Sequence, residues 1–294
     1  MIEKSRRLIS EYSKRYRRVY VLFSGGKDSL VVLLLTLNTI GSENFSVLYT
    51  RLPGNTAPEC DEYVKSICNE LGVELVVAYR KINFWEQMKR RGFPYIKGMR
   101  WCAQRYKYDV WKKLGGKNTL FISGVKRKDR IIRSKMMKEY QYVELWDSYA
   151  IAPISFWSKT QVIDFIRKHN VPLNPLYQEI GHSGNCLFCP FLDKKSFMRT
   201  MRRYWNVATM LYEIVLNPPE SDVNRKKLKG LVKGSQYVYE WLCKNLEILE
   251  KESQYEKFLY EGYDQCPSEL YELLYWGFIY ECLNGKGEIV TEKW

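Results

Sequence analysis

The chain has 294 residues, of which 46% are hydrophobic and 27% charged, a composition typical of a globular protein with a sizeable core. No run approaches the ~18 consecutive apolar residues of a membrane-spanning helix, and the charged N-terminus lacks a signal-peptide core, so we expect a cytoplasmic protein with no membrane partner. The net charge of +14 is uneven, because residues 211–294 hold 10 basic and 15 acidic residues, which leaves +19 on residues 1–210. This excess favours an anionic partner such as a nucleotide, sulfate or nucleic acid, although ordinary surface Lys and Arg would give the same balance.

Hydrophobic patterns typical of strands and helices alternate along the first two thirds of the chain. A basic amphipathic helix over residues 3–17 comes first. The alternation predicts an α/β fold with an open, mostly parallel twisted sheet and helices on both faces. Strands are expected at residues 18–23, 45–50, 73–79, 118–125 and 151–155, and further helices at residues 28–39, 58–71 and 159–170.

The pattern changes at about residue 195, where helical spacing with many Tyr and Trp begins. Core packing is the ordinary use of such aromatic residues, although they would also suit a partner protein or single-stranded nucleic acid. We therefore expect two domains, an α/β domain over residues 1–192 that carries a CxxC element and a mainly helical C-terminal domain over residues 193–294.

A polar loop, Ser-Gly-Gly-Lys-Asp-Ser at residues 24–29, separates the first predicted strand from a hydrophobic helix. Gly25 and Gly26 permit a sharp turn with no side chain over it, and the N–H groups and dipole of the helix start favour an anion. The loop also supplies a cation and two hydroxyl donors, namely Lys27, Ser24 and Ser29. These features predict a phosphate-binding site.

The loop at residues 24–29 is not a Walker A loop, because its spacing is shorter than Gly-x-x-x-x-Gly-Lys-Ser/Thr. The alternative is a tight strand-to-helix turn without a ligand. That alternative leaves Lys27 and Asp28 unexplained at the carboxyl end of a strand, where open α/β sheets bind ligands, so we favour phosphate binding.

This loop resembles the PP-loop of the adenine nucleotide alpha hydrolase superfamily, whose Rossmann-like members bind ATP or a related adenylyl compound and typically act at its α-phosphate. Three further segments resemble the phosphoadenosine phosphosulfate (PAPS) reductase family, so the resemblance covers residues 19–192. The segments are GNTAPECDEYV at residues 54–64, SGVKRKDRIIR at residues 123–133, and residues 151–191 with Pro153, Trp157, Val162, Pro172, Pro175, Leu176, Tyr177, Cys186 and Cys189 at the expected places.

The resemblance implies a nucleotide-binding domain in which the whole loop from Ser24 to Ser29 contacts ATP or a related adenine nucleotide. It implies Lys27 and Asp28 as catalytic residues, with Mg²⁺ beside the Asp28 carboxylate. One departure from the family precedes residues 54–64, since the chain reads Tyr49-Thr50-Arg51 where the family has an aspartate.

A cluster of cations follows the strand expected at residues 118–125. A solvated basic loop is one explanation, but the cluster should lie on the same sheet edge as the glycine loop, so we favour an anion site. Lys126 is a like-charge replacement in the family signature, and Arg130 replaces a serine. The cofactor-binding residues expected here are Gly124, Lys126, Arg127, Arg130 and Arg133.

Eight cysteines in a cytoplasmic chain argue against a disulfide scaffold, and the CxxC at Cys186 and Cys189 stands out among them. Residues 99–107 resemble the Arg-x-Cys-Cys-x-x-x-Lys element of iron–sulfur members of the family, although Ala103 replaces the second cysteine. The resemblance implies Cys102, Cys186 and Cys189 as metal ligands of a [4Fe-4S] cluster, with Zn²⁺ as the alternative metal.

The fourth metal ligand stays open among Cys266, Cys60 and His182. The alternative to a metal centre is a CxxC that binds no metal, for example a redox-active dithiol. The chain has only two histidines, so we do not expect histidine acid–base chemistry.

Two enzymatic reactions and one binding function fit these features. In the first reaction, the enzyme adenylates a substrate with ATP and a sulfur nucleophile then displaces AMP, as in thiolation of tRNA or phosphorothioation of DNA, with a sulfur donor protein or thiol as partner. In the second, a reductase with Cys282 as nucleophile releases sulfite from PAPS or adenylyl sulfate; here Leu283 replaces the family's glycine and no histidine follows. A nucleotide-dependent binding module is the non-enzymatic alternative.

Overall fold

The structure is a computed structural model, and it describes residues 1–92, 94, 100–127, 138–189, 191–216 and 289–293. Four predicted site residues lie outside the described residues, namely Arg130, Arg133, Cys266 and Cys282. The helices are α1 (Ile2–Ser13), α2 (Lys27–Ile40), α3 (Pro58–Glu70), α4 (Phe84–Arg91), α5 (Trp101–Ala103), α6 (Asp109–Leu114), α8 (Lys159–Lys168), α9 (Leu176–Glu179), α10 (Lys194–Arg203) and α11 (Trp205–Leu216). The strands are β1 (Arg18–Leu22), β2 (Ser46–Thr50), β3 (Glu74–Arg80), β4 (Thr119–Ser123), β5 (Tyr140–Val143), β6 (Ser148–Ile151) and β7 (Ile289–Lys293).

The strands form one seven-stranded sheet in the order β5-β6-β4-β1-β2-β3-β7. Neighbouring strands from β6 to β3 are parallel, whereas β5 and β7 are antiparallel at the two edges. The central strand β1 therefore pairs with β2 on one side and with β4 on the other. This mostly parallel α/β fold confirms the predicted fold class.

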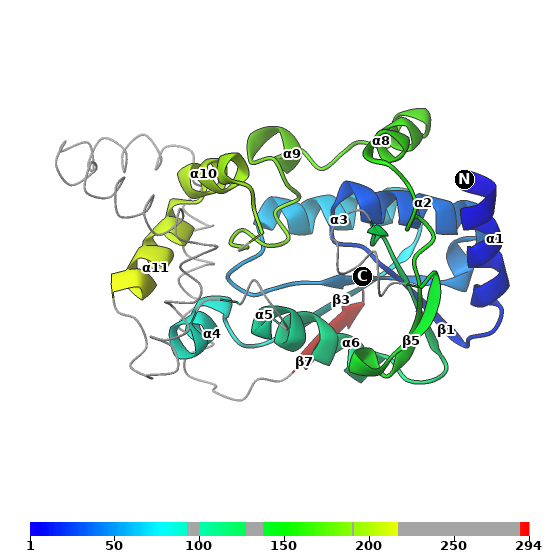
Figure 1. The fold of residues 1–294 in the computed structure, drawn as a ribbon, viewed down its shortest axis with the longest axis horizontal. Helices are drawn as coiled ribbons and strands as arrows, with labels where there is room; N and C mark the ends of the chain where they lie inside the picture. The colour runs from blue at the N-terminus through cyan, green and yellow to red at the C-terminus, as the bar shows by residue number, and fades with distance from the viewer. Residues whose placement is uncertain (93, 95–99, 128–137, 190, 217–288, 294) are drawn as a thin grey trace.

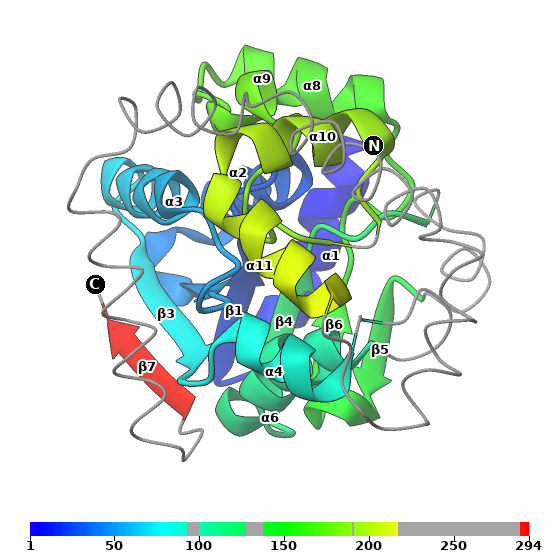
Figure 2. The same ribbon diagram turned by 90° about the vertical axis from the view of Figure 1, so that its left-hand side faces the viewer.

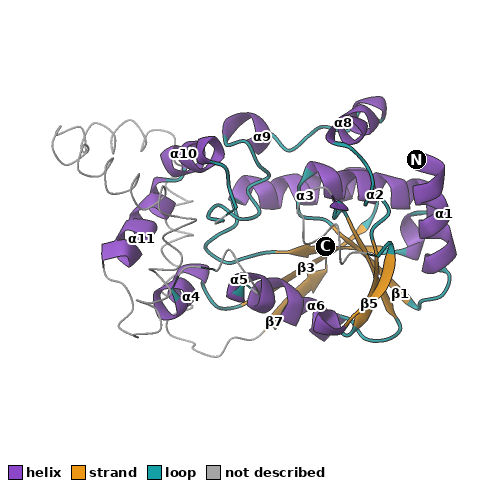
Figure 3. Cartoon of the chain, in the orientation of Figure 1, coloured by secondary structure: helices purple, strands orange, loops and turns teal. Residues whose placement is uncertain are grey.

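Helices cover both faces of the sheet, as Figures 1 and 3 show with α2 and α3 on one face and α6 on the other. The larger core lies on the α2 face, where the residues from Leu30 to Leu35 are all buried. A helix that is apolar all round must be covered on all sides, and α2 packs between the sheet and helices α1 and α8. A smaller core on the other face contains Val110 of α6 and Phe121 of β4.

Local sequence explains where several helices begin. The Asn83 side chain accepts a hydrogen bond from the Trp85 N–H at 2.8 Å and so caps α4. At α8, the Ser158 hydroxyl and the Gln161 side chain form a reciprocal capping box. Pro58 occupies the first turn of α3, where its missing N–H costs nothing.

The strand predicted at residues 151–155 is wrong, because β6 covers Ser148–Ile151 instead. Pro153 has no N–H for the sheet, and the next residues turn, with the Ser155 N–H donating to the Ala152 carbonyl at 3.1 Å. The edge strands β5 and β7 and the helices α4 to α6 were not predicted. The strand β7 lies within the region expected to be mainly helical.

Helices α10 and α11 pack against the same core as the sheet rather than standing apart from it. Phe197, Met201 and Val207 are buried in the larger core, and Figure 2 shows α10 and α11 lying across the face beside α2 and α4. The division at residue 192 stays a prediction. Within the described ranges, no helix combines the length and apolar character that crossing a membrane requires.

Candidate functional site

The glycine loop between β1 and α2 is held in place by its own hydroxyl groups. Gly25 has φ +70°, a left-handed conformation that favours glycine. The Ser29 hydroxyl donates to the Gly26 carbonyl at 2.8 Å and accepts from the Ser24 N–H at 3.2 Å. These bonds hold the turn between β1 and α2, and the first N–H groups of α2 have no acceptor within the helix.

The loop lies where the strand order of the sheet reverses. The chain passes from β1 to β2 on one side, whereas β4 adds to the other side of β1. At the end of β4, a Cβ on Gly124 would lie 2.8 Å from the backbone of Asp28 and of Ser29. Gly124 therefore lets the end of β4 approach the start of α2 closely, at the point where open α/β sheets bind ligands.

A partly buried ion pair joins the end of β4 to the start of α2. The Lys126 side chain is only 4% exposed and that of Asp28 is 27% exposed, and the Lys126 ammonium lies 2.6 Å from Asp28 Oδ1. The sequence predicted both as nucleotide-binding residues, and the structure shows that each already has an oppositely charged neighbour. Removing either charge would take away a neutralising neighbour of the other, and the cost is larger for the more deeply buried Lys126.

The segment around helix α9 packs over the glycine loop from above the sheet edge. The Tyr177 hydroxyl oxygen accepts the Lys27 N–H at 3.1 Å, and the Lys27 ammonium lies 5.0 Å from the centre of the Tyr177 ring. The Asn174 side chain donates to the Ser183 carbonyl at 2.9 Å and to the Gly25 carbonyl at 3.4 Å. Burial raises the pKa of Tyr177 to about 12, so its hydroxyl stays protonated and can donate to an anion over the loop.

Arg127 follows Lys126 at the same end of β4. Its N–H donates to the Ser155 carbonyl at 2.9 Å, and its guanidinium lies 4.5 Å from the centre of the Phe156 ring. The structure therefore brings Gly124, Lys126 and Arg127 to the sheet edge of the glycine loop. The remaining predicted members of this cluster, Arg130 and Arg133, belong to the part of the chain that is not described.

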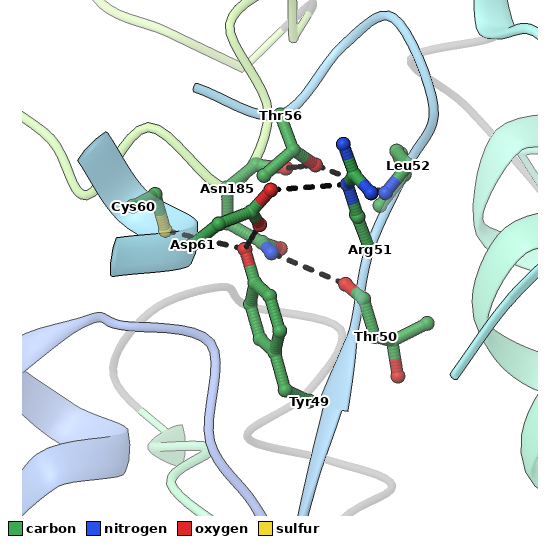
Figure 4. A network of polar contacts seen from close by, with 8 residues as sticks. All are labelled: Tyr49, Thr50, Arg51, Leu52, Thr56, Cys60, Asp61 and Asn185. Atoms are coloured by element: carbon green, nitrogen blue, oxygen red, sulfur yellow. Dashed lines mark hydrogen bonds and ion pairs between the residues drawn. The ribbon is translucent and has the colours of Figure 1, made fainter. Parts of the chain in front are cut away.

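A polar network next to the glycine loop includes residues 49–51, the segment in which the family's aspartate is missing (Figure 4). The Tyr49 hydroxyl donates to Asp61 Oδ1 at 2.7 Å, and Arg51 Nε lies 3.0 Å from Asp61 Oδ2. Burial raises the pKa of Asp61, whereas Arg51 and the Tyr49 hydrogen bond act in the opposite direction. Asp61, on the first turns of α3, thus supplies a carboxylate beside β2 that the sequence comparison did not find.

Cys60 links this network to the glycine loop. Its thiol contacts the Ser24 carbonyl at 3.7 Å and the Tyr49 hydroxyl at 3.5 Å. A Cβ on Gly25 would lie 3.0 Å from the Cys60 sulfur. Burial raises the pKa of Cys60 to about 12, so the thiol is neutral and serves here as a packing group against the loop.

The CxxC segment is hydrogen-bonded to the loop that follows β2. The Asn55 side chain donates to the Phe188 carbonyl at 3.0 Å and accepts the Phe188 N–H at 2.7 Å. The Asn185 side chain donates to the Thr50 carbonyl at 3.2 Å and accepts from Lys107 at 3.3 Å. These bonds fix residues 185–188 beside the ends of β2 and α3.

The three predicted metal ligands come close enough to influence one another. Burial, followed by the charge of Cys186, raises the pKa of Cys102 to about 12, and the same two causes raise that of Cys189. All the cysteines among the described residues are free thiols. However, no three Cys, His, Asp or Glu side chains of the described ranges form a group that could hold a metal ion. The predicted cluster or zinc site is therefore not confirmed.

His182 does not offer a free nitrogen to a metal. Its Nδ1 accepts the Gly184 N–H at 3.2 Å, and its Nε2 lies 2.8 Å from Thr200 Oγ1. Because the Thr200 hydroxyl donates to the Ser196 carbonyl, it accepts from His182, which fixes the neutral Nε2–H tautomer. Burial accordingly lowers the pKa of His182 to about 4.

Sequence reasoning missed the residues that hold the glycine loop from the side. Tyr177 matched the family pattern without a role, and Asn174 and Asp61 were not singled out. Their only signal was position, since Asn174 precedes a proline next to the matched tyrosine and Asp61 lies one residue after Cys60.

Residues 18–192 match the family model described as the phosphoadenosine phosphosulfate reductase domain. Two uncharacterized proteins of Methanocaldococcus jannaschii are 28% identical over 67% of this chain and 29% identical over 69%. The chain spans 42% and 49% of the length of these relatives, less than half in each case. Over 91 residues it is 33% identical to adenosine 5'-phosphosulfate reductase 2 of Bacillus subtilis, covering 30% of this chain and 37% of that protein.

Solved structures with a related arrangement share little sequence with the chain. The phosphoadenylyl-sulfate reductase of Candida auris in a phosphate complex has a TM-score of 0.44 and 16% identity, covering 60% of this chain and 84% of that one. The FMN adenylyltransferase of Candida glabrata in complex with ATP has a TM-score of 0.44 and 15% identity, covering 60% of this chain and 57% of that one. Similarity at this level carries no conclusion about function.

Proposed function

Because this chain belongs to the phosphoadenosine phosphosulfate reductase domain family, we propose that it is an enzyme that binds ATP or a related adenine nucleotide at residues 24–29. The observation that carries the proposal is the position of the glycine loop, at the strand reversal between β1 and β4. There the start of α2, Lys27 and the Tyr177 hydroxyl converge on one small region. Such a convergence of N–H groups and a cation suits phosphate oxygens.

The reaction that we favour is activation of a substrate by adenylation, followed by sulfur transfer. A substrate oxygen attacks the α-phosphorus of ATP, the bond from that phosphorus to the oxygen bridging the α- and β-phosphates breaks, and pyrophosphate leaves. A sulfur nucleophile from a donor protein or thiol then attacks the activated centre, and AMP leaves with the substrate oxygen. The positive charge of the chain supports a nucleic acid, tRNA or DNA, as the substrate.

Each loop residue has a separate part in this proposal. The Lys27 ammonium and the N–H groups of the first turn of α2 that follow Lys27, whose own N–H donates to Tyr177, hold the departing pyrophosphate and offset the negative charge that develops on it. The Tyr177 hydroxyl donates to a neighbouring phosphate oxygen. The ion pair of Lys126 with Asp28 keeps the end of β4 against the start of α2 and so sets the width of the site.

Magnesium is the metal that accompanies nucleotides in most such reactions, and it would neutralise phosphate charge when bound. Asp28 is the carboxylate of the glycine loop, but its Oδ1 pairs with Lys126 at 2.6 Å, so Mg²⁺ would have to compete with that ammonium. The thiols of Cys102, Cys186 and Cys189 do not meet the geometry of a metal centre.

Reduction of adenylyl sulfate or PAPS, with release of sulfite, is the second candidate. The similarity to the Bacillus subtilis reductase supports it. In this case Cys282 would attack the sulfur atom, and the sulfur–oxygen bond to the nucleotide phosphate would break, releasing the nucleotide and leaving a thiosulfonate on the cysteine. A thiol reductant would then release sulfite and form a disulfide with the enzyme.

The two reactions are separated by their products. We would incubate the anaerobic protein with α-labelled ATP, with and without total tRNA or DNA, and assay AMP and pyrophosphate. Products that require nucleic acid support adenylation, whereas sulfite from adenylyl sulfate, lost in Cys282→Ser, supports reduction. Lys27→Ala should weaken nucleotide binding at least tenfold, while Lys117→Ala, an exposed lysine beyond α6, serves as the matched control. Unchanged nucleotide affinity in Lys27→Ala would refute the assignment of the site.

A further inference from the structure

Helix α1 and the residues that follow it carry a dense row of exposed cations. Its inner face is fixed to the fold, because the Ser5 hydroxyl donates to the Pro153 carbonyl at 2.7 Å and accepts from the Trp157 indole at 3.1 Å. With Ser5 and Ile9 buried, the basic side chains must point outward. The exposed cations are Lys4, Arg7, Lys14, Arg15, Arg17 and Arg18, which we call the α1 track.

Much of the charge of the α1 track is not neutralised by nearby carboxylates. Lys4 pairs with Glu139 at 2.8 Å and Arg15 with Glu11 at 2.7 Å. Among the described residues, no ion pair involves Arg7, Lys14 or Arg17, and all three side chains are exposed. Exposed cations without partners bind phosphate groups at little desolvation cost.

The α1 track begins beside the proposed nucleotide site. The Lys4 ammonium lies 4.8 Å from the centre of the Phe156 ring, and the Arg127 guanidinium lies 4.5 Å from the same centre. Arg127 follows Lys126, which pairs with Asp28 of the glycine loop. A continuous line of contacts therefore connects the first turn of α1 with the loop at residues 24–29.

The other end of the α1 track borders a hollow at the amino ends of β1 and β2. The hollow has a volume of about 800 Å³, and three cations of the track line it together with Tyr16 and Tyr20. Glu43 and Glu74 also line it. The cations that line the hollow all belong to the track, so they extend the basic surface past the end of the helix.

We propose that the α1 track binds the phosphate backbone of a single-stranded nucleic acid and leads that strand to the glycine loop, an inference that rests on the proposed function for its substrate. From Lys4 to Lys14 the chain rises about 15 Å, a length over which more than one phosphate of the same strand can be contacted. The contacts are with phosphates, so binding does not depend on base sequence.

An anionic membrane is the other polyanion that a basic helix could meet. A helix that lies in a membrane needs an apolar face to insert. In α1 this face is already buried against the core through Ile9, with Leu8 and Tyr12 packed beside it. The structure therefore favours a nucleic acid over a lipid surface.

The test compares one variant of the track with a control of equal charge. Arg7→Gln, Lys14→Gln and Arg17→Gln are combined in the track variant, and Lys112→Gln, Lys113→Gln and Lys117→Gln in the control, which alters exposed lysines of α6 and the turn after it. Binding of a labelled 20-nucleotide DNA strand and of the matching RNA is measured by fluorescence anisotropy between 50 and 300 mM salt, a range chosen to resolve the counterion slope. Circular dichroism confirms that both variants are folded.

The track variant should bind at least tenfold more weakly at physiological salt, and its slope of log K against log salt should be smaller by about 2, from three contacts at roughly 0.7 each. The control should stay within twofold of the unaltered protein. Tight binding of either RNA or DNA supports the proposal equally, provided that the track variant loses it. Equal losses in both variants, or none in the track variant, would overturn it.

Two further arms separate this proposal from its alternatives. In the first, vesicles with about 30% anionic lipid, an amount sufficient to attract basic segments, replace the nucleic acid. Binding through the track to vesicles but not to oligonucleotides would overturn the proposal in favour of a membrane. Lys27→Ala should lose nucleotide affinity and keep nucleic-acid affinity. If the unaltered protein binds oligonucleotides through the track but binds no adenine nucleotide, the proposal about the α1 track is supported and the proposed function is refuted.

Discussion

Replacing Gly25 by alanine tests the packing of the glycine loop, because a second glycine provides a matched comparison. Gly25 has φ +70° and Gly72 has φ +62°, so an alanine at either position meets the same backbone strain. That strain costs about 1 kcal/mol. A stiffer unfolded chain offsets a few tenths of a kcal/mol of this cost at both positions.

The two positions differ in the space around the added methyl group. Nothing lies within 4 Å of a Cβ on Gly72, whereas a Cβ on Gly25 would lie 3.0 Å from Cys60 Sγ and 3.3 Å from both Asn174 Nδ2 and Val64 Cγ2. Overpacking of this kind costs ~1–3 kcal/mol. We therefore expect Gly25→Ala to reduce the free energy of unfolding by about 2–4 kcal/mol and Gly72→Ala by about 1 kcal/mol.

The assay is urea unfolding at equilibrium, with the midpoint and slope measured for each variant, and nucleotide affinity measured in parallel. Because the sulfur of Cys60 is the nearest atom, Cys60→Ala should relieve part of the crowding in Gly25→Ala. The double variant should then be about 1 kcal/mol more stable than additivity predicts. Equal losses at the two glycines, or strict additivity with Cys60→Ala, would refute the proposed crowding.

Three other changes probe the site. Asp28→Asn should destabilise the protein by about 2–3 kcal/mol, because it removes the carboxylate that pairs with the buried Lys126 ammonium. The double variant with Lys126→Met should cost less than the two single losses together, and additive costs in urea unfolding would contradict the pair. Burial lowers the pKa of His182 to about 4, so the folded protein keeps this imidazole neutral at pH values at which the unfolded chain would protonate it. The contribution of the neutral imidazole to the free energy of unfolding is therefore complete above pH 6.5, and it is lost as the pH falls towards 4. The loss is at most about 3 kcal/mol, and His182→Gln should show a smaller drop in stability between pH 7 and 4.5 than the unaltered protein does; an identical drop would argue against this role. Tyr177→Phe keeps the ring beside Lys27 but removes the hydroxyl. We expect the free energy of nucleotide binding, measured by calorimetry, to weaken by about 1 kcal/mol. An unchanged affinity would show that the hydroxyl does not contact the ligand.

The sequence predicted most of the sheet because its central strands carry their own local signals. The run before Ser24 is apolar and β-branched, and the glycines after it mark the turn, so both the strand and the start of α2 were found within one or two residues. The segment at residues 151–155 failed because its apolar residues are buried in a turn beside Pro153 rather than in a strand. Apolar composition predicts burial, but it does not by itself predict extended backbone.

The candidate site was harder to predict because its contacts join distant parts of the chain. Lys126 and Asp28 are 98 positions apart, and their pairing depends on the strand order rather than on either local pattern. The missing aspartate near Thr50 is a similar case, since Asp61 reaches the same region from the neighbouring helix. A comparison of sequences position by position does not find this carboxylate, because it comes from a different element of the fold.

The bonds between Asn55 and Phe188 also have a consequence for the order in which the molecule forms. They join residues 133 positions apart, so this contact must wait until a long stretch of chain has been synthesised and its ends have met. Asn174 and Tyr177 arrive with the same late segment and complete the walls of the glycine loop. A nascent chain that ends before residue 174 should therefore hold an assembled β1–α2 turn and still lack a finished nucleotide site. Ligand binding would then favour the completed state by mass action and act as a late step of maturation.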